Sequence, residues 1–333
     1  MKLLYPLILS LAILLSGCGR LSDGDSERTL ILAHAMHETH PVSVAMAWMP
    51  ERLREVSDGA LDMKIYPAGQ LGSERNLLEL TQIGTVGISK LSSATLENVI
   101  PEMRVFSLPY LFEDPEQRWD VWLGPVGQEL LKTGIPFRVR GIAYYDAGSR
   151  SIYTVNRPVF SPEDLNGLRI RVTESVMAMR LMRAMGASPA PLAFSELYTA
   201  FQGGVMDGAE NNPPSFHTTR HYEVCNYYTL NRHTVIPDML VISNPLWESL
   251  SEQERDWLQQ VVGESVELQR ELWQEAEAIA MQSFRDAGVK IIEPDLEPFR
   301  QSVQPFYDSI RTNDPELYAW VERIRAEAKG GNP

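Results

Sequence analysis

The sequence predicts an α/β protein of two lobes that one long helix connects, and three observations lead to this prediction. Segments typical of strands and of helices alternate from residue 29 onward, an order that favours parallel sheets covered by helices. The chain has 333 residues, more than a single hydrophobic core usually supports. A capping box at Ser251 begins a helical pattern of about 36 residues, or about 54 Å, which is longer than one lobe is wide.

Composition limits the partners and the covalent bonds of the chain. The formal net charge of −14 argues against nucleic acid or an anionic lipid surface as an electrostatic partner. An arginine in a pocket of so acidic a protein attracts an anionic solute locally. The chain has two cysteines, Cys18 and Cys225, and lipidation of the first would leave Cys225 without a partner. We therefore expect burial, and no disulfide, to hold the fold.

The first residues are typical of a bacterial export signal. Lys2 precedes an apolar run, residues 3–15, that is too short to span a membrane, and the tetrapeptide LSGC ending at Cys18 resembles a lipobox. We expect a lipoprotein signal peptide over residues 1–17, lipidation of Cys18, and a polar tether over residues 18–28. A plain cleaved signal with an incidental cysteine is the alternative, and export follows from either.

The first predicted strand, Thr29–Ala33, leads into a loop with three histidines between residues 34 and 40. Their spacing suits a metal site only on a helix, which the preceding strand and Pro41 argue against, so we expect no metal. Ligands gather at the carboxyl ends of parallel strands, which makes His34 and Glu38 candidates for the wall of a ligand site. A helix cap or a solvated loop is the alternative for Glu38.

The next elements continue the alternation: helix Val42–Ser57, strand Leu61–Tyr66, helix Ser73–Ile83, and a strand with its loop over Val86–Ser93. Glu74 lies in the first turn of the second helix, where a carboxylate either complements the helix dipole or binds a ligand. Lys90 lies in an apolar strand and is either a surface residue or part of a pocket wall.

Two strands are expected to pass between the lobes. Ile142–Val155 carries the chain out, with Gly148 and Ser149 allowing it to bend, and Ile236–Ser243 carries it back. The expected division is a first lobe of residues 29–148 with 237–277, and a second lobe of residues 149–236 with 278–333.

The most informative stretch begins with a capped helix start at Ser161 and continues into the strand Leu168–Val172. In that strand Arg169 and Arg171 share the face opposite the aliphatic residues. An unpaired arginine is costly to bury, so one at the end of a short strand meets solvent or an anion. The polar run 207–214 is so rich in turn formers that we expect irregular structure there.

Three segments, FSLPYLFED, SPEDLNGLRIRV and MGASPAPLAFSELYTAFQGGVMDGAENNPP, resemble the extracytoplasmic solute receptors of tripartite ATP-independent periplasmic (TRAP) transporters. The resemblance is to the dicarboxylate-binding-protein type and covers nearly the whole mature chain, with the motifs in the same order. It implies a two-lobed periplasmic binding protein fold in which the lobes close around a solute, with the long helix spanning both lobes.

The resemblance also implies roles for particular residues. The arginine that ends the GLRIRV strand, Arg171, would bind a substrate carboxylate through a two-pronged salt bridge. Arg150 and Asn211 match two further positions of the family, and Glu74 matches a glutamate near the substrate. Together with the candidates above, the predicted substrate-binding residues are Arg171, Arg150, Asn211, Glu74, His34, Lys90 and Glu210, with Glu38 and Asn212 in a wider set and no metal or cofactor.

The predicted ligand follows from the acidic members of this set. Carboxylates such as Glu74 and Glu210 repel a second substrate carboxylate but accept hydrogen bonds from hydroxyls, which favours a polyhydroxylated monocarboxylate. The segments HETHP and AGSRSIY are also similar to receptors of sugar acids. We therefore predict a hexuronate or a related sugar acid, with a C4-dicarboxylate as the alternative.

A transport receptor and an enzyme are the two classes to distinguish. The resemblance implies a monomeric receptor in the periplasm, anchored by its lipid, that delivers its organic acid to the small and large membrane subunits of a permease. An exported lipoprotein hydrolase acting on acidic sugars is the alternative from another class. The chain has no Gly-x-Ser-x-Gly, HExxH, P-loop or GxGxxG motif, so we predict that it is not an enzyme.

Overall fold

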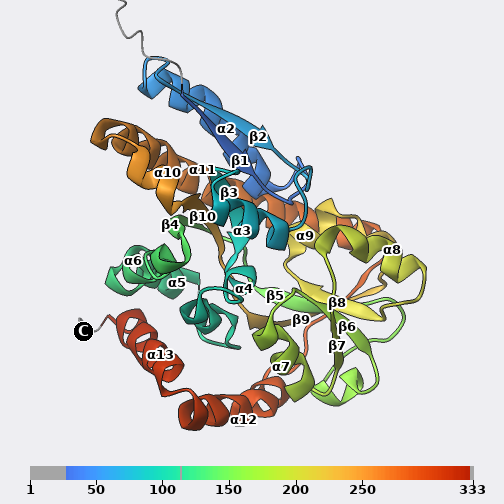
Figure 1. Cartoon of the computed structure of the whole chain (residues 1–333). Coiled ribbons are helices and arrows are strands. Elements are labelled where there is room, and N and C mark those ends of the chain that lie inside the picture. Colours follow the sequence, from blue (N-terminus) through green and yellow to red (C-terminus); the bar gives the residue numbers. More distant parts are fainter. Residues whose placement is uncertain (1–27, 113–114, 331–333) are drawn as a thin grey trace, which may run out of the picture.

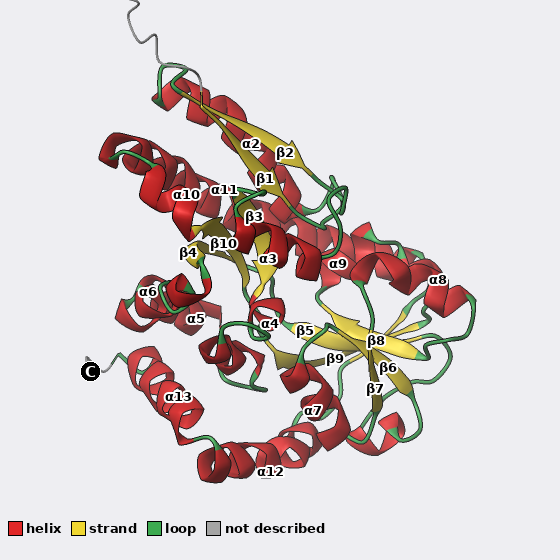
Figure 2. Cartoon of the chain, in the orientation of Figure 1, coloured by secondary structure: helices red, strands yellow, loops and turns green. Residues whose placement is uncertain are grey.

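The computed structural model describes residues 28–112 and 115–330. Two β-sheets, each covered by helices, form two lobes (Figures 1 and 2). We call the lobe built on the sheet β2-β1-β3-β10-β4 the first lobe, and the lobe built on the sheet β11-β9-β5-β8-β6-β7 the second lobe. The two-lobed α/β fold is thereby confirmed. The expected signal peptide, Cys18 and nearly all of the tether lie outside the described residues.

The first sheet is mixed, whereas a parallel sheet was expected. Its strands are β1 (Arg28–Ala33), β2 (Leu61–Tyr66), β3 (Ile88–Ser92), β4 (Val139–Tyr145) and β10 (Asp238–Ser243). β1 pairs in parallel with β2 and β3, as the alternation of strands and helices predicts. β10 runs antiparallel to both β3 and β4 because the chain re-enters this lobe directly from the other one, without a helical crossover.

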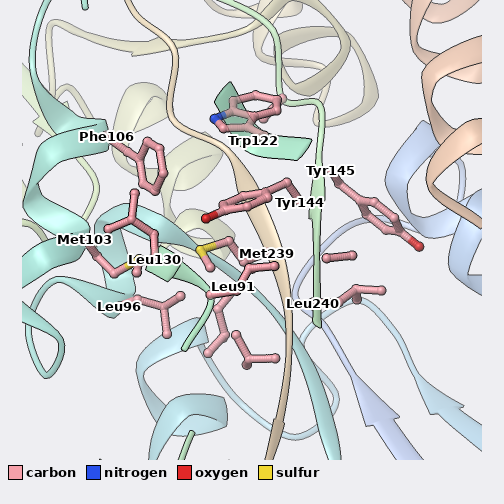
Figure 3. Close-up of a cluster of buried hydrophobic side chains, with 14 of the residues drawn as sticks. Leu91, Leu96, Met103, Phe106, Trp122, Leu130, Tyr144, Tyr145, Met239 and Leu240 are labelled. Carbon is pink, nitrogen blue, oxygen red and sulfur yellow. The ribbon is translucent and has the colours of Figure 1, made fainter. Parts of the chain in front are cut away.

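The helices of the first lobe enclose an aromatic core. They are α2 (Pro41–Val56), α3 (Glu74–Ile83), α4 (Ser93–Leu96), α5 (Pro115–Leu123), α6 (Pro125–Leu130) and α10 (Asn244–Ser249), with 3₁₀ turns over Pro101–Ser107 and Ile135–Phe137. Trp122 stacks on Tyr144 with ring centroids 5.7 Å apart, and Phe106 meets the same tyrosine edge-on (Figure 3). Such aromatic contacts add to the stabilisation that the first lobe gains from burying apolar surface.

The second sheet contains the strand with Arg169 and Arg171 and the polar run 207–214. Its strands are β5 (Arg150–Thr154), β6 (Arg169–Val172), β7 (Ser188–Pro191), β8 (Gly208–Asn211), β9 (Tyr227–Thr234) and β11 (Lys290–Ile292). The prediction that residues 207–214 are irregular is wrong, because they form β8 and the start of α9 (Pro213–Thr218). β8 pairs with β5 and β6 on its two sides, and these backbone bonds outweigh the weak strand propensity of its residues.

The second lobe has shorter helices and its own aromatic core. Besides α9, short helices between its strands are α7 (Val176–Ala184) and α8 (Leu197–Gln202), with 3₁₀ turns over Pro162–Leu165, Phe194–Glu196 and His221–Glu223. Phe216 packs edge-on against Phe284, with ring centroids 4.8 Å apart, and Tyr153 and Tyr228 stack nearby. Cys225 is a free thiol buried in this core.

One helix, α11 (Glu252–Asp286), connects the lobes. Its 35 residues begin at a capping box in which Ser251 and Glu254 bond to each other's backbone N–H, as predicted. α11 packs on α2 and β4 of the first lobe and on α9 and β11 of the second (Figure 1). The prediction of a helix that spans both lobes is therefore confirmed. No helix in the described part of the chain is long and apolar enough to cross a membrane.

The segment between β4 and β5 crosses from one lobe to the other against α11. The side-chain amide of Gln269 accepts from the N–H of Asp146 and donates to its carbonyl, both at 2.8 Å. Gly148 has a positive φ of 57°, and a Cβ there would lie 2.9 Å from the ring of Trp273. The predicted single strand Ile142–Val155 is therefore two strands, separated at the glycine that was expected to allow a bend.

The C-terminal helices return the chain to the first lobe. α12 (Glu297–Asn313) packs on α7 of the second lobe, whereas α13 (Pro315–Ala328) packs on α5 and α6 of the first (Figure 1). Leu317, Val321 and Ile324 join the first core. α13 thus differs from the expected placement of residues 278–333 in the second lobe, because its apolar stripe is complementary to the first. The other expected boundaries stay a prediction.

Replacing Gly148 by alanine should lower the free energy of unfolding by more than the strain of an alanine at positive φ accounts for. Gly204→Ala is the matched control, because Gly204 also has a positive φ, 65°, but open space around its Cα. We expect a loss of about 1 kcal/mol for Gly204→Ala and about 3 kcal/mol for Gly148→Ala, since the new methyl group also overlaps Trp273. Urea unfolding measures both, and equal losses would contradict the packing argument.

Candidate binding site

A cavity of about 210 Å³ lies between the lobes. The first lobe contributes the loops after β1 and β2, the start of α3, and residues at the end of β3. The second lobe contributes residues at the ends of β6 and β8 and the loop 192–195. Side chains at the carboxyl ends of several strands therefore converge here, the usual place for a ligand in α/β sheets.

Arg171 lies in this cavity with part of its hydrogen-bonding capacity unused. It is the third residue of β6, and its side chain is held by a hydrogen bond from Nε to the carbonyl of Leu192, at 2.8 Å. The residue is only 3% exposed, and within the described residues neither Nη1 nor Nη2 donates to a protein acceptor. Burial lowers the pKa of its guanidinium, yet an arginine stays charged. Such a group is a suitable anchor for an anion.

Arg150, the first residue of β5, lies in the same cavity, but a carboxylate neutralises it. Its guanidinium donates to Oε1 of Glu210 at 2.8 Å, to Oε2 of Glu210, and to Oδ1 of Asn211 at 2.9 Å. Burial tends to raise the pKa of Glu210, but Arg150 and His233 outweigh it and hold that pKa at about 2. Glu210 lies behind Arg150 and does not line this cavity, so it neutralises the arginine.

Asn211 presents a donor to the cavity. Its Oδ1 accepts from Arg150 and from the backbone N–H of Asn212, both at 2.9 Å, which assigns the oxygen and leaves the amide NH₂ free. Asn212 caps α9 by accepting from the N–H of Ser215 at 2.8 Å. Both asparagines line the cavity, as does Ser215.

The opposite wall, from the first lobe, is acidic. Lys90 is completely buried, and its Nζ lies 2.7 Å from Oε1 of Glu74 and 3.0 Å from Oδ1 of Asp238. The second oxygen of Glu74 accepts from the N–H of Ser92 at 3.0 Å and from the hydroxyl of Thr95 at 2.8 Å. One ammonium thus faces two carboxylates, and this wall keeps a net negative charge.

The two carboxylates differ in how well the protein compensates their burial. For Glu74, burial raises the pKa, but Lys90 and the bonds from Ser92 and Thr95 lower it further, so the carboxyl titrates below its ordinary value. For Asp238, burial outweighs the same ammonium and raises the pKa. Asp238 was not among the residues predicted from the sequence. The signal for it was a carboxylate directly after Pro237, at the start of an apolar strand.

The histidines of the first loop do not join the cavity. His34 is 1% exposed and lies behind the wall, with its Nε2 3.5 Å from the hydroxyl of Ser43, and burial lowers its pKa to about 4. His40 caps α2 through Nδ1, so its Nε2 donates to the hydroxyl of Ser215, at 3.2 Å, across the two lobes. No group of three or more metal-binding side chains occurs in residues 28–112 and 115–330.

The predicted set is thus divided by the fold. Arg171, Arg150, Asn211, Glu74 and Lys90 line one cavity from both lobes, whereas His34 and Glu210 lie behind its walls. Glu38 is exposed and also lies outside the cavity lining. Phe194, which the sequence analysis did not select, covers Arg171, with its ring centroid 5.8 Å from the guanidinium carbon. Phe194 begins a 3₁₀ turn of three residues, which is too short to give a periodic signal.

Two lobes around a cavity with a cationic anchor define a solute-binding receptor. The sequence model of the bacterial extracellular solute-binding protein family 7, named DctP, matches residues 32–314. The chain belongs to this family, which comprises the periplasmic receptors of TRAP transporters.

Relatives and solved structures agree with this assignment over most of the chain. The protein YiiZ of Salmonella typhimurium is 37% identical over 301 residues, which are 90% of this chain and 91% of its own. The C4-dicarboxylate-binding periplasmic protein DctP of Rhodobacter capsulatus is 31% identical over 300 residues, 89% of this chain and 87% of its own.

Two TRAP periplasmic solute-binding proteins with bound sugar acids have similar structures. That of Sulfitobacter, with β-D-galacturonate, has a TM-score of 0.87 at 32% identity and covers 90% of this chain and 99% of its own. That of Anaerococcus prevotii, with D-glucuronate, has a TM-score of 0.88 at 32% identity and covers 91% and 99%.

Replacing Lys90 by methionine should destabilise the protein most at neutral pH. The ammonium keeps Glu74 ionised, so the stability it supplies is present above the ordinary glutamate pKa of 4.5 and is lost in acid. We expect a loss of about 3–5 kcal/mol near neutral pH that shrinks as both carboxyls become protonated. Urea unfolding from neutral to acidic pH measures it.

The control for this prediction combines Lys90→Met with Glu74→Gln and Asp238→Asn. Removing all the charges together should restore most of the lost stability and flatten the pH dependence of the difference. A deficit that is the same in acid and at neutral pH would show that Lys90 acts through packing alone.

Proposed function

We propose that the chain is a receptor for a hexuronate, such as glucuronate or galacturonate, or for a closely related sugar acid. The observation that carries the proposal is the contrast between Arg171 and the other two cations of the cavity. Arg150 is neutralised by Glu210, and Lys90 by two carboxylates. Among the described residues that line the cavity, Arg171 is the one cation without a carboxylate partner, which suits a solute with one carboxylate.

The remaining groups of the cavity suit hydroxyls. Glu74 and Asp238 can accept hydrogen bonds from them, and the free amide of Asn211 can donate one. A second carboxylate near the acidic wall would meet like charge without a free cation to offset it. The galacturonate and glucuronate in the similar structures support the same class of ligand.

A C4-dicarboxylate is the second candidate, because the Rhodobacter capsulatus relative is named for binding one. It would need a second free cation, which Arg150 could supply only by giving up Glu210. The ion pair between Arg150 and Glu210 favours the hexuronate, because leaving the buried carboxylate of Glu210 without its arginine would cost free energy.

We also propose how the bound solute reaches the membrane. A hexuronate that touches both walls favours their closed arrangement, and the closed receptor then delivers it to the small and large membrane subunits of a TRAP permease. We further propose that the receptor is monomeric, that a lipid on Cys18 anchors it, and that it performs no chemistry on the solute. The cavity offers a clamp for a carboxylate, and its acidic groups are already engaged by Lys90.

Replacing Arg171 should remove most of the affinity for the hexuronate. We expect Arg171→Ala to lose about 2–4 kcal/mol of binding free energy, and Arg171→Lys to recover little of it, because an ammonium cannot make the two parallel bonds of a guanidinium. Arg169→Ala is the control, since Arg169 lies on the same strand but is exposed and paired with Asp207. Calorimetry measures all three, and full-strength binding by the lysine variant would refute the role of Arg171.

The identity of the solute can be tested by thermal stabilisation. A ligand present at 100 times its dissociation constant should stabilise the folded protein by about 2.7 kcal/mol. We expect a rise in melting temperature with glucuronate or galacturonate and none with succinate or malate. Stabilisation by the dicarboxylates alone would transfer the proposal to the second candidate. Stabilisation by none of the four would contradict both.

A further inference from the structure

A buried carboxylate outside the cavity joins the two lobes. Glu97 follows α4 of the first lobe and is 7% exposed. Its Oε1 accepts from the hydroxyl of Ser175 at 2.6 Å and from the N–H of Met177 at 3.0 Å, both at the start of α7 in the second lobe. Its Oε2 accepts from Ser107 of its own lobe at 2.8 Å.

The next residue adds a second bond between the lobes. Asn98 donates through Nδ2 to the carbonyl of Glu174 at 2.7 Å and to the carbonyl of Thr95 at 3.0 Å. Glu97 and Asn98 together therefore hold residues 174–177, the segment that directly follows β6, the strand that carries Arg171. We call these two residues the clasp.

The clasp lies at the edge of the cavity without belonging to it. Thr95 bonds to Glu74 in the cavity wall, two residues before Glu97, and Thr173 and Glu174 line the cavity from the other lobe. Neither Glu97 nor Asn98 lines the cavity. If the lobes separate at this edge of the cavity, the bonds from the clasp to Ser175, Met177 and Glu174 must break.

The strength of these bonds suits a contact that opens and closes. Burial of the Glu97 carboxylate is costly and raises its pKa, and the three donors offset only part of this cost in the arrangement seen here. When the lobes separate, water replaces the two donors of the second lobe, Ser175 and Met177, while Ser107 stays with Glu97. The net gain per hydrogen bond is therefore modest, and the clasp biases the equilibrium between lobe arrangements without locking it.

We propose that Glu97 and Asn98 are positioning residues that hold the two lobes together beside the cavity and so slow the release of the solute without touching it. The lobe contact is independent of the ligand, whereas the effect on release rests on the proposed hexuronate function. Because the clasp does not contact the solute, it should change the dissociation rate of the solute but not the preference between solutes.

Two variants weaken the clasp in different ways. Glu97→Gln keeps the shape and an acceptor for Ser175 and Met177 but replaces charge-assisted bonds by neutral ones. Asn98→Ala removes the donor to Glu174 from an exposed position, where no cavity forms and folding should be unaffected. The matched controls are Glu79→Gln and Asn313→Ala, which change exposed residues with only local partners.

The first measurement is the distance between the lobes in the ligand-free protein. Spin labels on Ile83→Cys in the first lobe and Val205→Cys in the second use exposed positions, and the buried Cys225 does not react. The mature chain with Cys18→Ser serves as background. We expect both clasp variants to shift the distance distribution toward longer values, while the controls match the parent. Unchanged distributions in both clasp variants would overturn the proposal.

The second measurement is the dissociation rate of glucuronate by stopped-flow fluorescence. Each clasp variant should release it about 3- to 10-fold faster, with an unchanged association rate and an unchanged order of preference between glucuronate and galacturonate. Unchanged release, or a changed order of preference, would refute the role in retention. If the parent protein binds no hexuronate, the proposed function fails, and the distance measurement still decides whether the clasp holds the lobes.

Discussion

A guanidinium that is buried without an anionic partner is the feature on which the rest of the cavity depends. Arg171 is desolvated by its position in β6 and steadied by the carbonyl of Leu192, so the protein bears the cost of burial before any solute arrives. In the proposed function, a carboxylate that enters would recover this cost through two parallel charge-assisted bonds. Phe194 covers the same group and limits the access of water.

The other buried charges near Arg171 are balanced within the protein. Arg150 and Glu210 neutralise each other, and Lys90 lies between Glu74 and Asp238. The consequence is a polarised cavity, cationic on the second lobe and acidic on the first. A solute with a carboxylate at one end and hydroxyls along the rest matches both walls, and it can do so only when the lobes are together.

The same polarity explains why the connections between the lobes matter. The chain crosses beside α11, where Gln269 binds the backbone of Asp146 and Gly148 lies against Trp273. Around the cavity, the lobes also meet through His40 with Ser215 and through the clasp. The crossing segment and the inter-lobe contacts thus lie around the same cavity, and under our proposal a change at one of these contacts would alter how the cavity walls face each other.

The sequence by itself determined the elements whose signal is local. The capping box at Ser251 and the long apolar periodicity predicted α11, and the alternation around Leu61–Tyr66 predicted β2 with its observed bounds. The motif resemblance indicated the two lobes and the arginine at the end of β6. These predictions succeed because capping, periodicity and strand alternation depend on neighbours along the chain.

Only the tertiary structure decided which charged groups remain free. Residues 207–214 look like a turn but form β8, because strands on both sides supply their backbone bonds. Arg150 and Lys90 resemble anchors in the sequence, yet partners 60 and 148 residues away neutralise them. Asp238 and Glu97 gained their roles in the same way. Pairing of buried charges is decided by distance in space, and no periodicity in the chain encodes it.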